Sequence, residues 1–89
     1  MITKEYKVQN KLGIHARPAG LLVKTSSRYK SSVYIASVGN EVNAKSIMGV
    51  LMLGDAYGSE IQLRVDGEDE EQAIAALEQL IMVRKFDEE

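Results

Sequence analysis

The sequence contains no cysteine, one proline and one histidine among its 89 residues, and these low counts restrict what the protein can be. Without cysteine, disulfide bridges and thiolate metal sites are excluded, and a small secreted scaffold held by disulfides is not expected. The first eight residues carry charges and no apolar signal-peptide core. No apolar run approaches the roughly 20 residues that a membrane span needs. We therefore expect one domain over residues 1–89, located in the cytoplasm and not inserted into a membrane.

Charge is distributed unevenly along the chain, although the formal net charge is only −2. Residues 1–45 contain eight basic and two acidic residues, whereas residues 46–89 contain three basic and eleven acidic residues. The acidic excess argues against nucleic-acid binding driven by phosphate neutralisation. The basic first half suits an acidic partner surface or an anion, and a solvated dipolar surface explains the same charges equally well.

Four segments alternate between apolar and polar residues with a period of two, which indicates β-strands. These segments are 2–8, 33–35, 41–43 and 61–66. Gly39 and Asn40 supply turn residues between the second and third segments, so these two strands are expected to form a hairpin.

Three segments carry apolar residues at helical spacing, namely 16–28, 44–53 and 69–81. Pro18 fits the first of these helices only in its first turn, so this helix is predicted to begin immediately after His15. Ser46 is the expected N-cap of the second helix. Asp69 and Gln72 form a capping-box pattern at the start of the third.

The predicted element order is βαββαβα, which belongs to the α+β class. Because each helix has a single apolar stripe, we expect a two-layer open-faced sandwich: a four-stranded antiparallel sheet covered on one face by three helices. The other face should be solvated, in agreement with polar residues such as Glu5 and Arg64 on the outer positions of their strands.

His15 stands at the predicted entrance of the first helix. The first N–H groups of a helix lack internal partners and lie at the positive end of the macrodipole, so such an end binds phosphate readily. Arg17 would add a planar fork of donors, and both features favour the neutral imidazole that attacks a phosphoryl group. A lone histidine near a helix start is more often a surface residue, but its combination with Gly13, Arg17 and Pro18 favours a transient phosphoryl acceptor.

Two motifs, Gly13-Ile-His-Ala-Arg-Pro-Ala19 and Asn43-Ala-Lys-Ser-Ile-Met-Gly49, resemble those of HPr, the histidine-containing phosphocarrier family of the bacterial sugar phosphotransferase system, in its low-GC Gram-positive form. The resemblance covers essentially the whole chain. It implies a carrier with a phosphohistidine intermediate rather than an enzyme. His15 would accept phosphate on Nδ1 from phospho-enzyme I, itself charged by phosphoenolpyruvate, and would pass it to the IIA domains of sugar-specific enzymes II. Arg17 would contact the phosphate, and neither a metal nor a cofactor is expected.

Ser46 has a second implied role. In the resembled family an ATP-dependent HPr kinase/phosphorylase modifies this serine, which weakens transfer to His15 and recruits a transcriptional repressor. A phosphate at a helix N-terminus is compatible with the fold, and its main effect would be repulsion of an acidic partner. An N-cap role alone would also explain the serine.

An apolar cluster beside Ser46 is a candidate surface for docking partners. It consists of Ile47, Met48, Leu51 and Met52. Some of these side chains must face the core, but on so short a helix at least one should be exposed. Lys24 is a further candidate for contact with enzyme I and the IIA domains. A monomer without a nucleic-acid partner is expected.

Three positions depart from the family pattern. Leu12 replaces a small polar residue that commonly helps to hold the phosphate, Gly20 lies early in the first helix, and Met52 enlarges the apolar cluster.

Three other functions are compatible with the sequence. One alternative is a phosphatase, for which Asn10 is the only candidate near His15 to position water. The others are a non-transferring regulatory module, whose members are expected to lack the histidine, and a nitrogen-regulatory carrier, which differs only in its partners.

Overall fold

The computed structural model describes residues 1–7, 16–37, 39–53 and 60–83. Its elements are β1 (Ile2–Lys7), α1 (Ala16–Ser27), β2 (Ser32–Ser37), β3 (Asn40–Asn43), α2 (Ile47–Leu53), β4 (Glu60–Asp66), α3 (Glu70–Glu78) and the π-helical turn η1 (Gln79–Val83). The predicted order βαββαβα is confirmed. The predicted turns at 10–13 and 57–59 lie outside the described residues.

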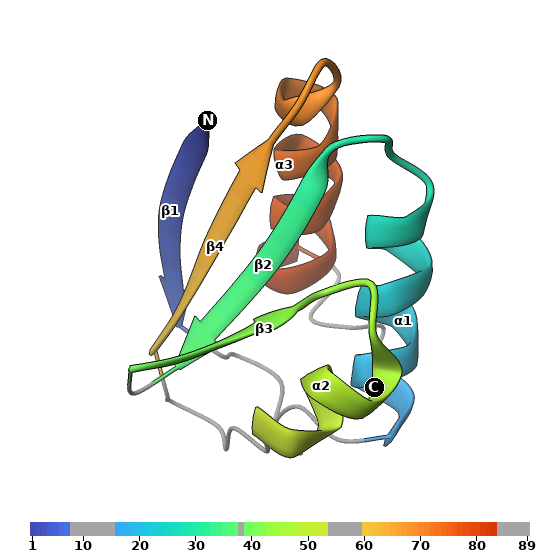
Figure 1. The fold of residues 1–89 in the computed structure, drawn as a ribbon, viewed down its shortest axis with the longest axis vertical. Helices are drawn as coiled ribbons and strands as arrows, with labels where there is room; N and C mark the ends of the chain where they lie inside the picture. Colours follow the sequence, from blue (N-terminus) through green and yellow to red (C-terminus); the bar gives the residue numbers. More distant parts are fainter. Residues whose placement is uncertain (8–15, 38, 54–59, 84–89) are drawn as a thin grey trace.

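The four strands form one antiparallel sheet in the order β1-β4-β2-β3. Ile35 in β2 lies opposite Leu63 in β4 and Val42 in β3, so apolar residues line up across neighbouring strands on one face. Figure 1 shows α1 and α3 behind the sheet, on one of its two faces. The predicted open-faced sandwich is therefore confirmed.

The core lies between the inner face of the sheet and the apolar stripes of the helices. The strand residues at alternate positions are buried, as the period of two predicts: Val33, Ile35, Ile61, Leu63 and Val65. The helices contribute residues three and four positions apart: Ala19 and Leu22 from α1, and Ala73, Ile74, Leu77, Leu80 and Ile81 from α3 and η1. Since these stripes face one way only, the opposite face of the sheet remains solvated.

The second helix begins directly after Ser46, the predicted N-cap. Ala44 and Lys45 form a turn, and α2 begins at Ile47. The backbone N–H of Ala44 donates to the carbonyl of Val33 at 2.9 Å, which holds Ala44 beside β2. The N–H of Lys45 donates to Oδ1 of Asn43 at 2.8 Å, an Asx-turn contact that competes with helix formation. The apolar segment 44–53 therefore becomes helical only after Ser46, as the predicted N-cap requires.

The predicted capping box at the third helix is wrong. Asp69 is the N-cap residue of α3, but its side chain makes no capping hydrogen bond. Its carboxylate instead accepts hydrogen bonds from the backbone N–H groups of Lys30 and Ser31, at 2.8 Å and 2.9 Å, in the connection between α1 and β2. Glu70, one residue later, accepts from the N–H of Gly67 at 3.1 Å. The start of α3 is therefore tied to a distant segment and not capped by its own first turn.

Candidate functional site

The described part of α1 begins at Ala16, and the predicted helix boundary after His15 stays a prediction because His15 lies outside the described residues. Pro18 lies in the first turn, where its missing N–H removes no helical hydrogen bond. The first turn contains no acidic residue that would oppose an anion. His15 and Leu12 lie outside the described residues, as does the side chain of Arg17, although its backbone belongs to α1.

The described part of the first motif, residues 16–19, lies at the same end of the molecule as the second motif (Figure 1). The first turn of α1 lies at the end of the sheet where β1 and β2 finish and β4 starts, and α2 lies at the same end (Figure 1). The helices α1 and α2 are in contact with each other. The fold thus brings the segment after His15 near the helix that follows Ser46, although about thirty residues of chain separate them.

Ser46 caps α2, as predicted. Its carbonyl accepts the N–H of Val50 at 3.0 Å, and its Oγ accepts the N–H of Gly49 at 3.3 Å. The side chain is exposed, so its hydroxyl is accessible at the surface. Gly49 lies where α2 approaches β3, since a Cβ there would come within 3.3 Å of Val42 Cβ.

The predicted apolar cluster on α2 is exposed to a greater extent than the sequence indicated. The exposed fractions are 40% for Ile47, 67% for Met48, 37% for Leu51 and 81% for Met52. Only Val50, which lies between them, is fully buried. Because the helix has one buried position and four exposed apolar ones, its outer surface is suited to contact with another protein. Lys24 in α1 is also exposed.

Lys45 makes a contact that the sequence did not reveal. Its ammonium Nζ donates to the backbone carbonyl of Tyr29 at 2.7 Å, just beyond the end of α1. No local signal indicates this partner, because the contact spans sixteen residues and depends on how the two helices pack.

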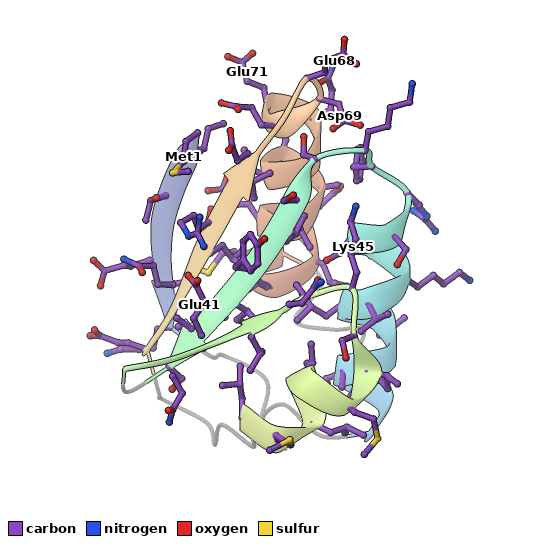
Figure 2. The ribbon with its side chains drawn as sticks, in the orientation of Figure 1. Met1, Glu41, Lys45, Glu68, Asp69 and Glu71 are labelled. Atoms are coloured by element: carbon purple, nitrogen blue, oxygen red, sulfur yellow. The ribbon has the colours of Figure 1, made fainter. Side chains whose placement is uncertain are left out.

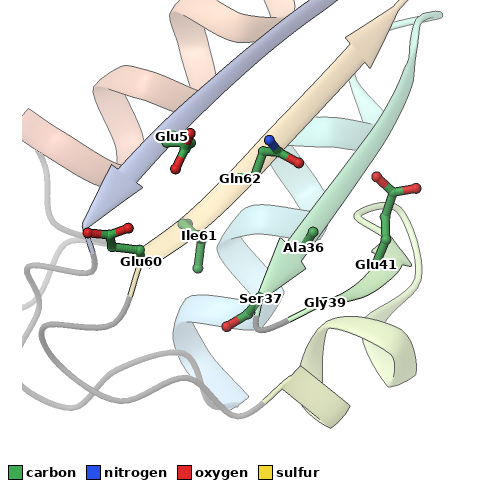
Figure 3. A pocket seen from close by; sticks show the side chains of 8 residues that line it. All are labelled: Glu5, Ala36, Ser37, Gly39, Glu41, Glu60, Ile61 and Gln62. Atoms are coloured by element: carbon green, nitrogen blue, oxygen red, sulfur yellow. The ribbon is translucent and has the colours of Figure 1, made fainter.

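A hollow of about 510 Å³ lies on the open face of the sheet, and none of the predicted site residues lines it. Figure 3 shows the side chains of Glu5, Gln62 and Glu41 on the face opposite the helices, whereas Ile61 belongs to the core. The hollow is lined by Glu5, Ala36, Ser37, Gly39, Glu41, Glu60, Ile61 and Gln62. Glu41 is paired through two hydrogen bonds with Arg64, at 2.7 Å and 3.1 Å, which holds the pKa of that carboxyl below its usual value. The hollow is shallow and polar, so it has the character of a solvated sheet face.

In the described ranges, no group of three or more histidine, cysteine, aspartate or glutamate side chains could hold a metal ion. No helix within those same ranges is long and apolar enough to cross a membrane.

Comparison with known proteins agrees with the fold. The family model described as "PTS HPr component phosphorylation site" matches residues 2–82. The phosphocarrier protein HPr of Xylella fastidiosa is 49% identical over 80 residues, which are 90% of each chain. The phosphocarrier protein HPr of Treponema pallidum is 45% identical over 89 residues, the full length of both chains. The crystal structure of HPr-C-His from Thermoanaerobacter tengcongensis superimposes with a TM-score of 0.94 at 45% identity, covering 100% of this chain and 99% of that one.

These matches establish the class, a small phosphocarrier with an open-faced α+β fold. The chain belongs to the HPr family and is a phosphocarrier of the phosphotransferase system. A crystal structure of an HPr dimer from Thermoanaerobacter tengcongensis is also similar, with a TM-score of 0.75 at 44% identity over 90% of this chain and 92% of that one. The predicted monomer therefore stays a prediction.

Proposed function

We propose that His15 is the residue that carries the phosphate. It accepts a phosphoryl group on Nδ1 from phospho-enzyme I, which is charged by phosphoenolpyruvate, and passes it to the IIA domains of sugar-specific enzymes II. In this proposal the chain acts as one domain in the cytoplasm, needs no cofactor and has no small-molecule substrate of its own. We also propose that the protein is an HPr of the low-GC Gram-positive type.

The observation that carries this proposal is the start of α1 at Ala16, directly after the one histidine of the chain. A twelve-residue helix presents unpaired N–H groups and a positive partial charge at this end, and no acidic residue of the first turn opposes them. Arg17 belongs to the same turn and brings a cation whose planar guanidinium suits phosphate oxygens. Each charge-assisted hydrogen bond to a bound phosphate would contribute about 1.5–3 kcal/mol.

The test is incubation of the chain with phosphoenolpyruvate and enzyme I, followed by intact-mass measurement at neutral and acid pH. We expect one added phosphate that is stable at neutral pH, lost in acid and absent from His15→Ala. Ser46→Ala serves as the control and should retain the adduct. An adduct that persists in His15→Ala would contradict the assignment, and Arg17→Ala that accepts phosphate at the normal rate would remove Arg17 from the site.

The same experiment separates the alternative functions. A phosphatase would release inorganic phosphate from a phosphorylated substrate without any protein partner. A non-transferring regulatory module would form no adduct with enzyme I. A nitrogen-regulatory carrier would accept phosphate from the enzyme I of that branch in preference to the enzyme I of the sugar system, so paired assays with the two donors distinguish them.

We further infer that Ser46 is a regulatory site for an ATP-dependent HPr kinase/phosphorylase, and that its phosphorylated form recruits a transcriptional repressor. An exposed hydroxyl at the N-cap of α2 supports this role, because a phosphate there meets the positive end of the helix and does not enter the core. Incubation with the kinase and ATP should modify the chain but not Ser46→Ala. Failure of the chain to react, under conditions that modify a known substrate, would contradict the inference.

The exposed side chains of α2 are proposed to form the partner-binding surface, together with Lys24. They are Ile47, Met48, Leu51 and Met52. Methionine side chains adapt to differently shaped partners, which suits a carrier that must dock with both a donor and an acceptor.

A further inference from the structure

Lys45 is the one described lysine whose ammonium group hydrogen-bonds to the backbone of another element. Its Nζ lies 2.7 Å from the carbonyl oxygen of Tyr29, sixteen residues earlier in the chain, and the side chain is half-buried. Figure 2 shows the side chain extending from the turn after β3 alongside α1. The contact therefore joins the end of one helix to the residue that precedes the cap of the next.

The end of α1 provides a reason for the contact. After the last helical residue, the N–H of Arg28 bonds to the carbonyl of Thr25 at 3.2 Å, and that of Tyr29 to Ser26 at 3.3 Å, so the chain turns tightly. The carbonyls at a helix C-terminus carry the negative end of the macrodipole and favour a cation. Lys45 supplies that cation from a different segment.

The backbone around Lys45 is held at both sides. Its own N–H bonds to Oδ1 of Asn43, the N–H of Ser46 bonds to the carbonyl of Asn43 at 3.0 Å, and Ala44 is fully buried. Because the ammonium is bound to Tyr29 as well, a shift of Lys45 would break one or more of these hydrogen bonds. The position of the Ser46 cap is thereby linked to α1.

We propose that Lys45 is a positioning residue for Ser46, and that its bond to the Tyr29 carbonyl holds the start of α2 in the conformation that the kinase recognises. This inference rests on the proposed regulatory role of Ser46. Without the bond, the turn at 43–46 and the first turn of α2 would be held less firmly. Part of their ordering would then take place on binding, and this cost would appear in KM and not in kcat.

The test compares Lys45→Met, which removes the ammonium, with Lys45→Arg, which retains a cationic donor. Lys30→Met is the matched control, because Lys30 follows Tyr29 directly but its side chain makes no hydrogen bond or ion pair with any described residue.

With the kinase and ATP, Lys45→Met should raise the KM of the kinase for the chain roughly tenfold, which is the effect of one lost charge-assisted hydrogen bond, and should leave kcat unchanged. Lys45→Arg should restore most of the loss, and phosphorylation by enzyme I at neutral pH should be unchanged in all three variants. An unchanged KM in Lys45→Met, or an equal rise in Lys30→Met, overturns the proposal.

Amide hydrogen exchange tests the same proposal without the kinase. In Lys45→Met, the N–H groups of Gly49 and Val50, which bond to Ser46, should exchange roughly tenfold faster, while that of Leu63 in the central strand β4 is unchanged. Uniformly faster exchange, including Leu63, would show a merely global loss of stability and overturn the positioning role. If the kinase does not modify the wild-type chain, the regulatory role of Ser46 fails, and the exchange rates alone decide whether Lys45 positions it.

Discussion

Asp69 accepts two hydrogen bonds from Ser31, one from its backbone N–H at 2.9 Å and one from its Oγ. A third comes from the N–H of Lys30, so one carboxylate joins the start of α3 to the connection between α1 and β2. Figure 2 places Asp69 at the end of the molecule opposite α2. The neighbouring Gly67 has a φ of +156°, and a Cβ there would lie 2.6 Å from Ser31 Cα, so the two segments are in very close contact.

The Asp69 contacts predict a loss of stability in acid. The hydrogen bonds from Ser31 and Lys30 lower the pKa of Asp69 from 3.8 to about 2. Since the folded pKa lies below the unfolded value, the stabilisation is complete above about pH 4 and is lost as the pH falls towards 2. In Asp69→Asn, denaturant unfolding should show lower stability at pH 7 and a smaller decrease between these pH values. Glu71→Gln is the control, because exposed Glu71 makes no hydrogen bond or ion pair with the described residues. A decrease in Asp69→Asn as large as that in the wild type would contradict this account.

Two glycines predict opposite effects of the same substitution. At Gly20 in α1, a Cβ would meet no atom within 4 Å, so Gly20→Ala should stabilise the protein by about 1 kcal/mol through helix propensity. At Gly67, the same change forces an L side chain into an unfavourable φ and against the backbone of Ser31. Gly67→Ala should therefore destabilise by about 1–3 kcal/mol. Thermal and denaturant unfolding of both variants provide the check. A neutral or stabilising Gly67→Ala would contradict the close contact at Gly67, and a destabilising Gly20→Ala would contradict the helix-propensity argument.

Tyr6 predicts a loss of stability in alkali. Its hydroxyl donates to Oε1 of Glu78 at 3.0 Å, which ties the edge strand β1 to α3, and burial together with this carboxylate raises the Tyr6 pKa. Because the folded pKa is raised, the contribution is complete below about pH 10 and is lost as the pH rises above it. Tyr6→Phe should lose about 1 kcal/mol at pH 7 and show a smaller further decrease above pH 10. Tyr34→Phe is the matched control, since its hydroxyl makes no hydrogen bond within the described residues. Equal losses in the two variants would rule out a specific role for the Tyr6 hydroxyl.

The sequence predicted those parts of the structure that depend on near neighbours. The alternation of Ile61, Leu63 and Val65 requires one buried face, and Pro18 limits where α1 can start, so strands and helix boundaries followed from local patterns. Ser46 was recognisable as a cap for the same reason, because its partner Gly49 lies three residues away.

The parts that could not be predicted depend on residues far apart in the chain. Asp69 has the pattern of a local cap, yet its partners lie 38 and 39 residues earlier, and nothing in a local pattern indicates them. The contact of Lys45 with Tyr29 spans sixteen residues and depends on how α1 and α2 pack. The exposure of Met48 and Met52 likewise depends on which side of α2 faces the core. All seven residues of this helix are apolar or glycine, so the sequence has no polar side that would show which residues are exposed.

The exposed methionines of α2 predict a loss of partner binding without a loss of stability. Met48 and Met52 are 67% and 81% exposed, so an aspartate at either position enters water and should change the free energy of unfolding by less than about 0.5 kcal/mol. If the proposed docking surface is correct, desolvating that charge against an apolar partner surface should raise KM for phosphorylation of the chain by enzyme I about tenfold, the equivalent of about 1.4 kcal/mol. Gln72→Asp, on the exposed side of α3, adds the same charge away from α2 and is the control. Steady-state kinetics of phosphate acceptance, measured beside denaturant unfolding, give both quantities. If Met48→Asp and Met52→Asp accept phosphate with the KM of Gln72→Asp, enzyme I does not dock on this surface of α2.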